Sequence, residues 1–367
     1  YDCPSRERAG WLCDSFFTAR TAFLLSGSTG IEEDFLENFL LPDSVPGVPQ
    51  GMLPMCYPSD HPDGVFIPQW SLWLILQLHE FPRRSGDSEL VRRFEPKLTA
   101  LLNWFKGYEN EDGLLEKLPG WNFIEWSKAN EWVQEVHYPT NMLYARVLDC
   151  FSELYGSRSA RSKAARIRRK VHEQSYDGEF FVDNAVRKNG RLTPTGNRSE
   201  VAQYFAFFFG AASAEDHPEL WHKLVTEFGP DRKETGRHPQ IAHANAFVGN
   251  YLRLELLRRA GMHKQVCQEM VGYFTKMADA TGTLWENDSP AASCCHGFAS
   301  HVAVWIFHSV LGVSQDRLGA IQAELPDCGL DWAQGRLPRD KGWVSVDWSG
   351  RDYRVSLPEE VKRIQPS

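Results

Sequence analysis

The chain has 367 residues, of which 42% are hydrophobic, 13% aromatic and 24% charged, and its formal net charge is −8. The acidic balance and the lack of a basic stripe argue against a nucleic-acid partner. No apolar run approaches ~18 residues, so no membrane span is predicted.

The eight cysteines, adjacent Cys294 and Cys295 included, show no CxxC pair and no zinc spacing. We interpret them as small buried residues and predict no metal site.

Amphipathic segments follow one another through the first 312 residues, and two kinds alternate. The first kind is apolar or aromatic on most faces, which is typical of buried helices. It covers residues 10–26, 67–84, 136–156, 199–212, 241–260 and 298–312. The second kind has a narrow apolar stripe and many charges, which is typical of surface helices. It covers residues 31–39, 87–106, 158–173, 216–228 and 263–278.

The connections between these segments alternate in length as well. Short turns follow the apolar segments, whereas long irregular stretches follow the charged ones. The long stretches cover residues 40–66, 107–135, 174–198, 229–240 and 279–297. Loops of this length in a compact domain are usually functional. If successive helices run antiparallel, every long loop lies at the same end of the bundle, together with the opening residues of the chain.

These patterns predict an all-α domain over residues 1–313, an (α/α)6 toroid in which apolar helices form an inner ring. About six inner and five outer helices are present, so the first outer helix is expected to precede residue 1. After residue 313 the segment LPRDKGWVSVDWSGRDYRVSLPEEV alternates apolar and polar residues around a Gly turn. This pattern predicts a β-hairpin within a small C-terminal β domain, residues 314–367.

Carboxylates in the long loops are the candidates for chemistry. Glycoside cleavage needs one acid that protonates the leaving oxygen and a second carboxylate that attacks the sugar or activates a water. Glu7 lies between two arginines just before the first apolar helix. It is either a functional acid or a helix-start acid favoured by the helix dipole. Asp2 and Asp14 flank it and would raise its pKa, or they serve as a cap and a solvated helix residue.

The last long loop holds the second candidate. Glu286 follows Trp285 in the sequence TLWENDSP, and His296 begins the final inner helix. A loop glutamate is usually solvated and a histidine at a helix start is usually a cap. In a closed toroid, however, this loop lies beside the opening residues, and this position favours a functional reading.

Two further loops carry polar and aromatic clusters. The segment GWNFIEWSKANEW contains three tryptophans and two acids that line a sugar subsite or plug the barrel mouth. These residues are Trp121, Glu125, Trp126, Glu131 and Trp132. The segment YPSDHPDGVF contains Asp60, His61 and Asp63, for which we favour a role as turn formers.

The opening stretch DCPSRERAGWLCD closely resembles the signature of bacterial α-L-rhamnosidases, glycoside hydrolase family 78. That signature reads Asp-Cys-Pro-x-Arg, then Glu-Arg-x-Gly-Trp and an Asp. The later segments TLWE and SCCHGFAS resemble the family's Trp-Glu and Ser-x-Asn-His segments. The helices around VAQYFAFFFG and HANAFVGNYLRLELLRRAG are similar to its inner helices, and the tail resembles its C-terminal β domain. The resemblance covers essentially the whole chain.

The resemblance implies that Glu7 is the general acid and Glu286 the general base of an inverting reaction, with the two carboxyl groups ~6.5–9.5 Å apart. It also implies a set of residues around the rhamnose ring and the two glutamates, namely Asp2, Arg6, Trp11, Asp14 and His296. We add the aromatic-loop residues and the neighbour of the base as sugar-binding candidates, namely Glu125, Trp126, Trp132 and Trp285.

Three positions depart from the family pattern. Cys295 stands where the family usually has Asn, Cys13 replaces a Gly, and Glu125-Trp126 replaces an Asp-Trp pair. These changes leave the acid and the base in place and bear on sugar specificity.

The leading hypothesis is an inverting exo-glycosidase that removes terminal α-L-rhamnose. It needs no metal or organic cofactor, and upstream β domains of the same polypeptide are expected partners. Two alternatives stay open: a six-hairpin glycoside hydrolase of different sugar specificity, and a non-catalytic carbohydrate-binding relic.

Overall fold

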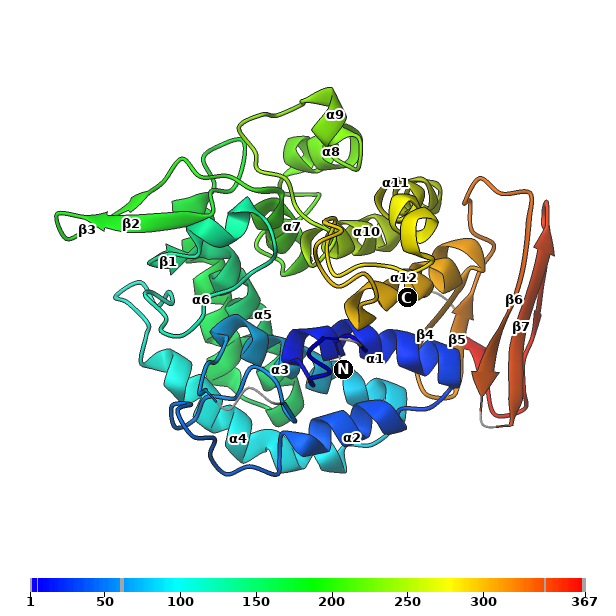
Figure 1. Ribbon diagram of the computed structural model, residues 1–367, viewed down its shortest axis with the longest axis horizontal. Helices are drawn as coiled ribbons and strands as arrows, with labels where there is room; N and C mark the ends of the chain where they lie inside the picture. The colour runs from blue at the N-terminus through cyan, green and yellow to red at the C-terminus, as the bar shows by residue number, and fades with distance from the viewer. Residues whose placement is uncertain (1, 5, 60–62, 340, 365–367) are drawn as a thin grey trace.

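The computed structural model describes residues 2–4, 6–59, 63–339 and 341–364. Asp60 and His61 therefore lie outside the described residues. The described part is mostly helical and ends in small β-sheets (Figure 1). One hydrophobic cluster joins the helices, and a second joins the sheets to the last helical segment.

The predicted buried helices are confirmed for five of the six apolar segments. They are α1 (Leu12–Ser26), α3 (Pro68–Ser85), α5 (Tyr138–Tyr155), α7 (Glu200–Phe208) and α10 (Gly249–Arg259). Fourteen of the eighteen residues of α3 are buried, so most of its faces contact protein. Its first residue is Pro68, which suits the first turn because that position needs no amide hydrogen bond.

The predicted surface helices are confirmed as well. They are α2 (Gly30–Asn38), α4 (Glu89–Lys106), α6 (Arg158–Ser175), α8 (Pro218–Glu227) and α11 (His263–Thr281). In α4 only six of eighteen residues are buried, and they recur at spacings of three and four. They are Leu90, Val91, Phe94, Leu98, Leu101 and Phe105. This spacing places them on one helix face, as the stripe in the sequence predicts.

The sixth apolar segment is not a regular α-helix. It consists of a 3₁₀ turn η2 (Gly297–His301), a short α12 (Val302–Trp305) and a π turn η3 (Ile306–Val310). The start is tightened because His296 accepts the amide of Phe298 on Nδ1 and that of Ala299 on its carbonyl. The end is widened because Leu311 donates to Ile306, five residues earlier.

The buried segments pack in chain order. Helix α1 contacts α3, α3 contacts α5, α5 contacts α7, and α7 contacts α10. Helix α10 contacts α12, and both α12 and η2 contact α1. The last buried segment therefore lies against the first, which brings the two ends of the helical region together (Figure 1).

The helix predicted over residues 241–260 begins only at Gly249. Buried carboxylates explain the late start, because they take the backbone amides that would join a helix. Glu200 accepts the amide of Ala244, and Glu125 accepts those of Asn245 and Gly249. A side chain at position 249 would not fit, since its Cβ would lie 2.5 Å from the Cβ of Ala244.

Three of the stretches predicted to be irregular contain regular structure. They hold η1 (Lys128–Trp132), a hairpin of β2 (Asn184–Lys188) and β3 (Arg191–Pro194), and α9 (Arg232–Thr235). Strand β1 (Val136–His137), which pairs with β2, occupies the first two residues of the segment predicted as a helix over 136–156. The hairpin turns at Asn189 and Gly190, both with positive φ. Asn-Gly between two strands is a strong hairpin signal, so the sequence did contain this element.

The β-hairpin predicted in the tail is confirmed and belongs to a larger β region. One sheet has the order β6 (Trp332–Arg339), β7 (Gly342–Ser349), β8 (Asp352–Ser356). The other has the order β4 (Val313–Arg317), β5 (Ala320–Ala323), β9 (Lys362–Ile364), and its β5–β9 pair is parallel. Leu24 of α1 and Val304 of α12 pack in the same cluster as these strands.

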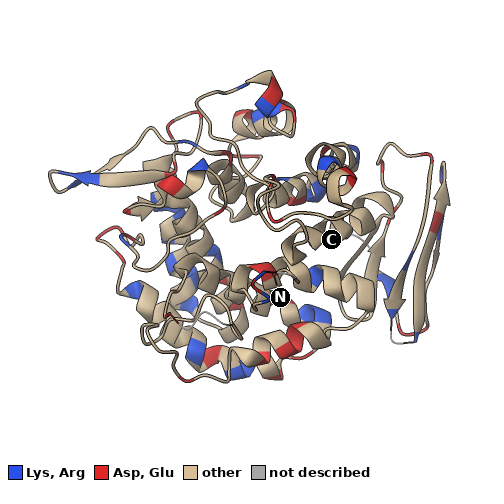
Figure 2. Cartoon of the chain, viewed as in Figure 1, with Lys and Arg blue, Asp and Glu red and all other residues tan. Residues whose placement is uncertain are grey.

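Figure 2 shows Lys and Arg interspersed with Asp and Glu over the helices. Among the described residues, no helix combines the length and the apolar character needed to cross a membrane.

Candidate active site

The opening residues form a closed loop that presents Arg6 and Glu7. The amide of Asp2 donates to the carbonyl of Ala9 at 3.1 Å, and the amide of Ala9 donates back to Asp2 Oδ1 at 2.9 Å. The carbonyl of Asp2 accepts the amide of Gly297 at 2.6 Å. The first loop of the chain is thus bonded to the start of its last buried segment.

Gly10 fixes the other side of this loop. It exchanges backbone hydrogen bonds with Tyr57 and Pro58, and a Cβ at this position would lie 2.5 Å from the carbonyl oxygen of Tyr57. Trp11 follows in an antiparallel bridge with Cys56 and is buried. The glycine and tryptophan of the opening motif therefore hold the loop against residues 55–58 rather than forming its tip.

Glu7 and Glu286 meet at one guanidinium. Arg6 Nη2 donates to Glu286 Oε2 at 2.9 Å and lies 3.6 Å from Glu7 Oε1. Because both oxygens contact the same nitrogen at 2.9 and 3.6 Å, they are no more than about 6.5 Å apart. The structure thus brings together the two glutamates that the sequence selected from opposite ends of the helical region.

Glu286 is held by groups from three segments. Besides Arg6, its Oε1 accepts the indole Nε1–H of Trp126 at 3.0 Å, and its Oε2 accepts the amide of Ser293 at 3.3 Å. The side chain is 7% exposed. Trp285 beside it is buried and donates to the hydroxyl of Thr281. These contacts fix the orientation of a carboxylate that remains an acceptor on both oxygens.

The environment separates the protonation of Glu7 from that of Asp2. Burial raises the pKa of Glu7, and the neighbouring carboxyls of Asp2 and Glu286 raise it further, against the opposing effect of Arg6. For Asp2, burial is outweighed by hydrogen bonds from the Cys3 thiol and the Ala9 amide, so its pKa is lowered. The protonated form is thus favoured at Glu7 and the ionised form at Asp2.

Asp14 and His296 lie beside each other near this pair. Burial raises the pKa of Asp14 to about 8, and the nearby Asp2 carboxylate adds to the effect. Burial lowers the pKa of His296 to about 4. His296 Nε2 lies 3.7 Å from Asp14 Oδ1, while its Nδ1 caps η2. Near pH 7 both groups are therefore neutral.

A pocket of about 1030 Å³ opens at this loop end. Its lining includes Asp2, Glu7, His296 and Ser300. This volume is at the upper end of the range usual for small-molecule sites, so it accommodates a sugar ring. Neither Glu286 nor Arg6 is part of this lining; the side chain of Glu286 is 7% exposed and that of Arg6 is 47% exposed.

The structure separates the aromatic-loop candidates. Trp126 contacts Glu286. Trp121 is exposed, and its ring centroid lies 6.2 Å from that of Trp126. Glu125 is fully buried and bonded to backbone amides, and its burial raises its pKa to about 7. Trp132 packs under Lys128. Among the contacts described, neither Glu125 nor Trp132 reaches Glu286 or the pocket lining.

Sequence reasoning missed the residues that join the loops to one another. Asn245 donates its side-chain amide to the carbonyl of Trp126 at 2.5 Å, and its Oδ1 accepts the amide of Asp288. Ser293 bonds Glu286 through its backbone. A backbone contact leaves no residue-type signal, and Asn245 falls inside the helix predicted over residues 241–260, which begins only at Gly249. Within the described ranges, no group of three His, Cys, Asp or Glu side chains could hold a metal ion.

Alternating buried and surface helices, whose loops meet around two glutamates, define the chain as a six-hairpin glycosidase domain. The profile of the bacterial alpha-L-rhamnosidase 6 hairpin glycosidase domain matches residues 1–310. The chain belongs to this family, which is glycoside hydrolase family 78.

Solved structures agree with this assignment at the level of the fold. A GH78 rhamnosidase of Bacillus sp. GL1 is 20% identical with a TM-score of 0.84, and the match covers 100% of this chain and 39% of that one. A Klebsiella oxytoca rhamnosidase with rhamnose bound is 16% identical with a TM-score of 0.67, covering 85% of this chain and 60% of that one.

A glycosidase of another family shares the fold. The GH63 mannosylglycerate hydrolase of Thermus thermophilus, in complex with Tris and D-glycerate, is 14% identical with a TM-score of 0.56. The match covers 82% of this chain and 93% of that one. A search of curated proteins found no significant match.

Proposed function

We propose that this domain hydrolyses terminal α-L-rhamnosides with inversion of configuration. The observation that carries the proposal is the placement of Glu7 and Glu286 on one guanidinium at the edge of a pocket of about 1030 Å³. Family membership and the rhamnose bound by the Klebsiella oxytoca protein support rhamnose as the sugar. The chain spans 39% of the Bacillus protein's length, so upstream β domains are part of the proposal.

Glu7 acts as the general acid in this proposal. Burial raises its pKa, which favours the protonated form that a general acid needs, and its side chain is 28% exposed at the pocket. It would protonate the glycosidic oxygen as the bond to the leaving group breaks. Asp2 stays ionised beside it and favours the developing positive charge on the sugar.

Glu286 acts as the general base. Both of its oxygens accept hydrogen bonds, which keeps the carboxylate oriented. It would deprotonate a water that attacks the anomeric carbon from the face opposite the leaving group. His296 is neutral and buried behind this centre, so we assign it and Asp14 to positioning and sugar hydrogen bonding rather than proton transfer.

The Arg6 guanidinium lies between the two proposed catalytic carboxylates. These oxygens of Glu7 and Glu286 are no more than about 6.5 Å apart, which is at or below the lower limit of the ~6.5–9.5 Å spacing of inverting enzymes. The Arg6 side chain is 47% exposed, and the contacts described for it are those with the two glutamates. We infer that substrate displaces its guanidinium toward the sugar hydroxyls, which widens the gap for a water.

The closed order of helix contacts supports the toroid proposed from the sequence. In this proposal residues 1–313 form the (α/α)6 barrel and residues 314–367 form the β domain. Ring closure is what places the first and last loops side by side. The proposed chemistry depends on that closure.

Proton NMR of the first-formed sugar tests the proposal. The enzyme is incubated with an aryl α-L-rhamnoside, and we expect the β-anomer to appear first and then to mutarotate. First appearance of the α-anomer would contradict an inverting reaction. The 367-residue chain and a version extended by its native upstream sequence are assayed together, because the proposed upstream β domains could contribute to the pocket.

A second candidate function is a six-hairpin hydrolase acting on another sugar. The likeness to the GH63 mannosylglycerate hydrolase and the departures at Cys13, Cys295 and Glu125 favour keeping it. A panel of aryl glycosides separates the two functions, since turnover of a non-rhamnoside alone would replace the first proposal. Rhamnose binding without turnover of any panel member would instead indicate the non-catalytic relic.

A further inference from the structure

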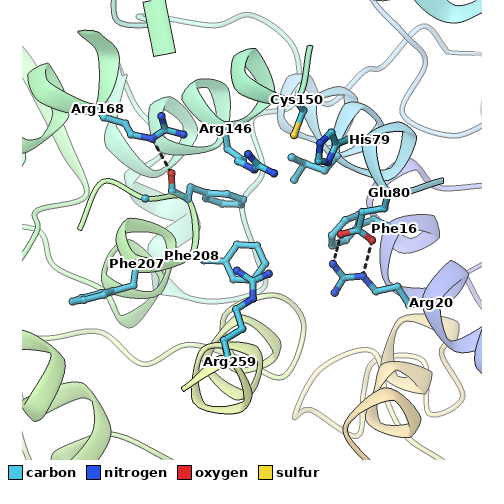
Figure 3. A pocket seen from close by; sticks show the side chains of 13 residues that line it. Phe16, Arg20, His79, Glu80, Arg146, Cys150, Arg168, Phe207, Phe208 and Arg259 are labelled. Carbon is cyan, nitrogen blue, oxygen red and sulfur yellow. Dashed lines mark hydrogen bonds and ion pairs between the residues drawn. The ribbon is translucent and has the colours of Figure 1, made fainter. Parts of the chain in front are cut away.

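A second pocket lies at the other end of the helices. Its volume is about 310 Å³, and Arg20, Arg146, Arg168 and Arg259 line it (Figure 3). We call it the arginine pocket. These side chains come from the middle or later parts of α1, α5, α6 and α10. The catalytic loops precede the buried helices, so the arginine pocket is separate from the proposed active site.

Positive charge dominates the lining of the arginine pocket. Four guanidinium groups face one carboxylate, that of Glu80. The Glu80 carboxylate already accepts hydrogen bonds from Nε and Nη2 of Arg20 and from Nη1 of Arg84, the last at 2.7 Å. A phosphate or carboxylate in the pocket would therefore meet fixed cations rather than free acids. This stands out in a chain whose net charge is −8.

Acids outside the lining neutralise these arginines only in part. Arg168 is the best paired, because it bonds Asp149 and also donates to the carbonyl of Phe209 at 3.0 Å. That second bond also satisfies a carbonyl at the end of α7, whose partial negative charge would otherwise disfavour an anion.

Arg146 and Arg259 keep most of their donors available. Arg146 Nη1 lies 3.5 Å from Glu153, longer than an ordinary hydrogen bond, and that carboxylate also lies 2.6 Å from His79 Nε2. Arg259 bonds Glu255 through Nε at 3.1 Å, and its guanidinium lies 4.2 Å from the ring centroid of Phe208. In Figure 3 the two side chains reach into the pocket from opposite sides.

We propose that the arginine pocket binds a small phosphate-bearing anion through Arg146 and Arg259. Guanidinium groups present planar pairs of N–H donors that match the oxygens of a phosphoryl group. The volume is at the lower end of the range for small-molecule sites, so the ligand is inorganic phosphate or a small phosphomonoester. The ring of Phe208 offers an apolar surface to the organic part of a monoester.

Isothermal titration calorimetry with inorganic phosphate and with glycerol 3-phosphate tests this proposal. Sodium chloride at equal ionic strength serves as the reference, because simple screening affects all arginines alike. Arg146→Gln should weaken binding at least about tenfold, as expected for the loss of a charge-assisted hydrogen bond. Arg161→Gln is the matched control, since Arg161 is exposed on the neighbouring helix α6 and lies outside the pocket. It should change the affinity less than about twofold.

A second variant keeps the test decisive if Arg146→Gln folds poorly. Glu153→Gln removes a negative charge next to Arg146 and should tighten phosphate binding. Binding of both probes identifies the phosphoryl group itself as the ligand, whereas binding of glycerol 3-phosphate alone identifies an organic phosphate.

Three results would overturn the proposal. One is a heat of phosphate titration no greater than that of the sodium chloride reference, which would mean that these arginines have only a structural role. Another is an equal loss of phosphate affinity in Arg146→Gln and Arg161→Gln. The third is loss of binding in Arg6→Gln but not in Arg146→Gln, which would move the anion to the active-site arginine.

Discussion

Glu7 and Glu286 are 279 residues apart in the chain, yet both contact Nη2 of Arg6, at 3.6 and 2.9 Å. Local sequence cannot produce this arrangement. It arises because the amide of Gly297 bonds the carbonyl of Asp2, which joins the last loop to the first. The two glutamates also differ in environment, since Glu7 is partly exposed at the pocket and Glu286 is buried beneath Arg6.

The roles of the two glutamates can be separated by the leaving group. Glu286→Gln removes the base and should lower kcat about 10²–10⁴-fold on every rhamnoside. Glu7→Gln removes the acid and should lower kcat by that factor on an alkyl rhamnoside, but far less on a nitrophenyl one, whose leaving group needs no proton. Initial rates on both substrates give the comparison. A Glu286→Gln enzyme of normal activity would refute its assignment as the base.

Arg6 should set the alkaline limb of the pH profile. Its positive charge opposes the upward shift of the Glu7 pKa. Arg6→Gln removes that charge, the pKa of Glu7 rises further, and the acid keeps its proton to higher pH. The alkaline limb of kcat/KM should therefore move to higher pH. Arg8→Gln, in the same loop, should move it less, and a shift to lower pH in Arg6→Gln would show that Glu7 is not the acid.

Trp126 should support catalysis through its indole N–H. Trp126→Phe keeps an aromatic ring but deletes the 3.0 Å hydrogen bond to Glu286. Hydrogen bonds to charged groups contribute about 1.5–3 kcal/mol, so kcat/KM should fall roughly tenfold or more. Trp121→Phe is the control, because Trp121 is similarly exposed in the same loop. Equal losses in both variants would assign the effect to the rings and not to the hydrogen bond.

Gly10 should tolerate no side chain. In Gly10→Ala the new Cβ would lie 2.5 Å from the carbonyl oxygen of Tyr57, and backbone must move to relieve it. We expect a loss of about 1–3 kcal/mol in the free energy of unfolding, measured with urea. Gly196→Ala is the control, because nothing lies within 4 Å of a Cβ there. An unchanged unfolding midpoint in Gly10→Ala would mean that the loop does not pack against Tyr57 in solution.

Asp183 should make stability depend on pH. Burial raises its pKa from 3.8 to about 8 in the folded chain. Folding must therefore protonate it above its unfolded pKa, so its contribution is full below about pH 4 and is lost as the pH rises toward 8. Asp183→Asn has no such group to protonate. Its free energy of unfolding relative to wild type should therefore increase by about 1.4 kcal/mol per pH unit between roughly pH 5 and 7.

Urea unfolding at several pH values measures this difference. Asp279→Asn, exposed on α11, should keep a constant difference from wild type. If the difference in the free energy of unfolding between Asp183→Asn and wild type did not change with pH, Asp183 would be ionised in the folded chain.

The sequence predicted the helices well because their signal is local. The stripe of α4 and the apolar faces of α3 are set by residues three and four apart, and their ends lie within two residues of the predicted positions. The prediction failed where distant groups compete for the backbone. Glu125 and Glu200 take the amides of residues 244–249, which delays the start of α10. The β2–β3 hairpin was missed although Asn189-Gly190 marked it.

The candidate site divides in the same way. Glu7 and Glu286 could be selected from the sequence, because Glu7 lies in a charged motif just before the first apolar helix and Glu286 follows Trp285 in a long loop. The burial of Glu125 could not be predicted, because its partners Asn245 and Gly249 lie in a loop about 120 residues away in the chain.

The sequence alone determined which segments are helical, which faces are buried and which motif residues are candidates for chemistry. Only the tertiary structure decided that Arg6 contacts both glutamates, that Trp126 bonds Glu286 and that Glu125 is buried against backbone amides. The reason is physical. Helix formation depends on neighbours one turn away, whereas burial and charge at a site depend on chain segments that meet only in the folded chain.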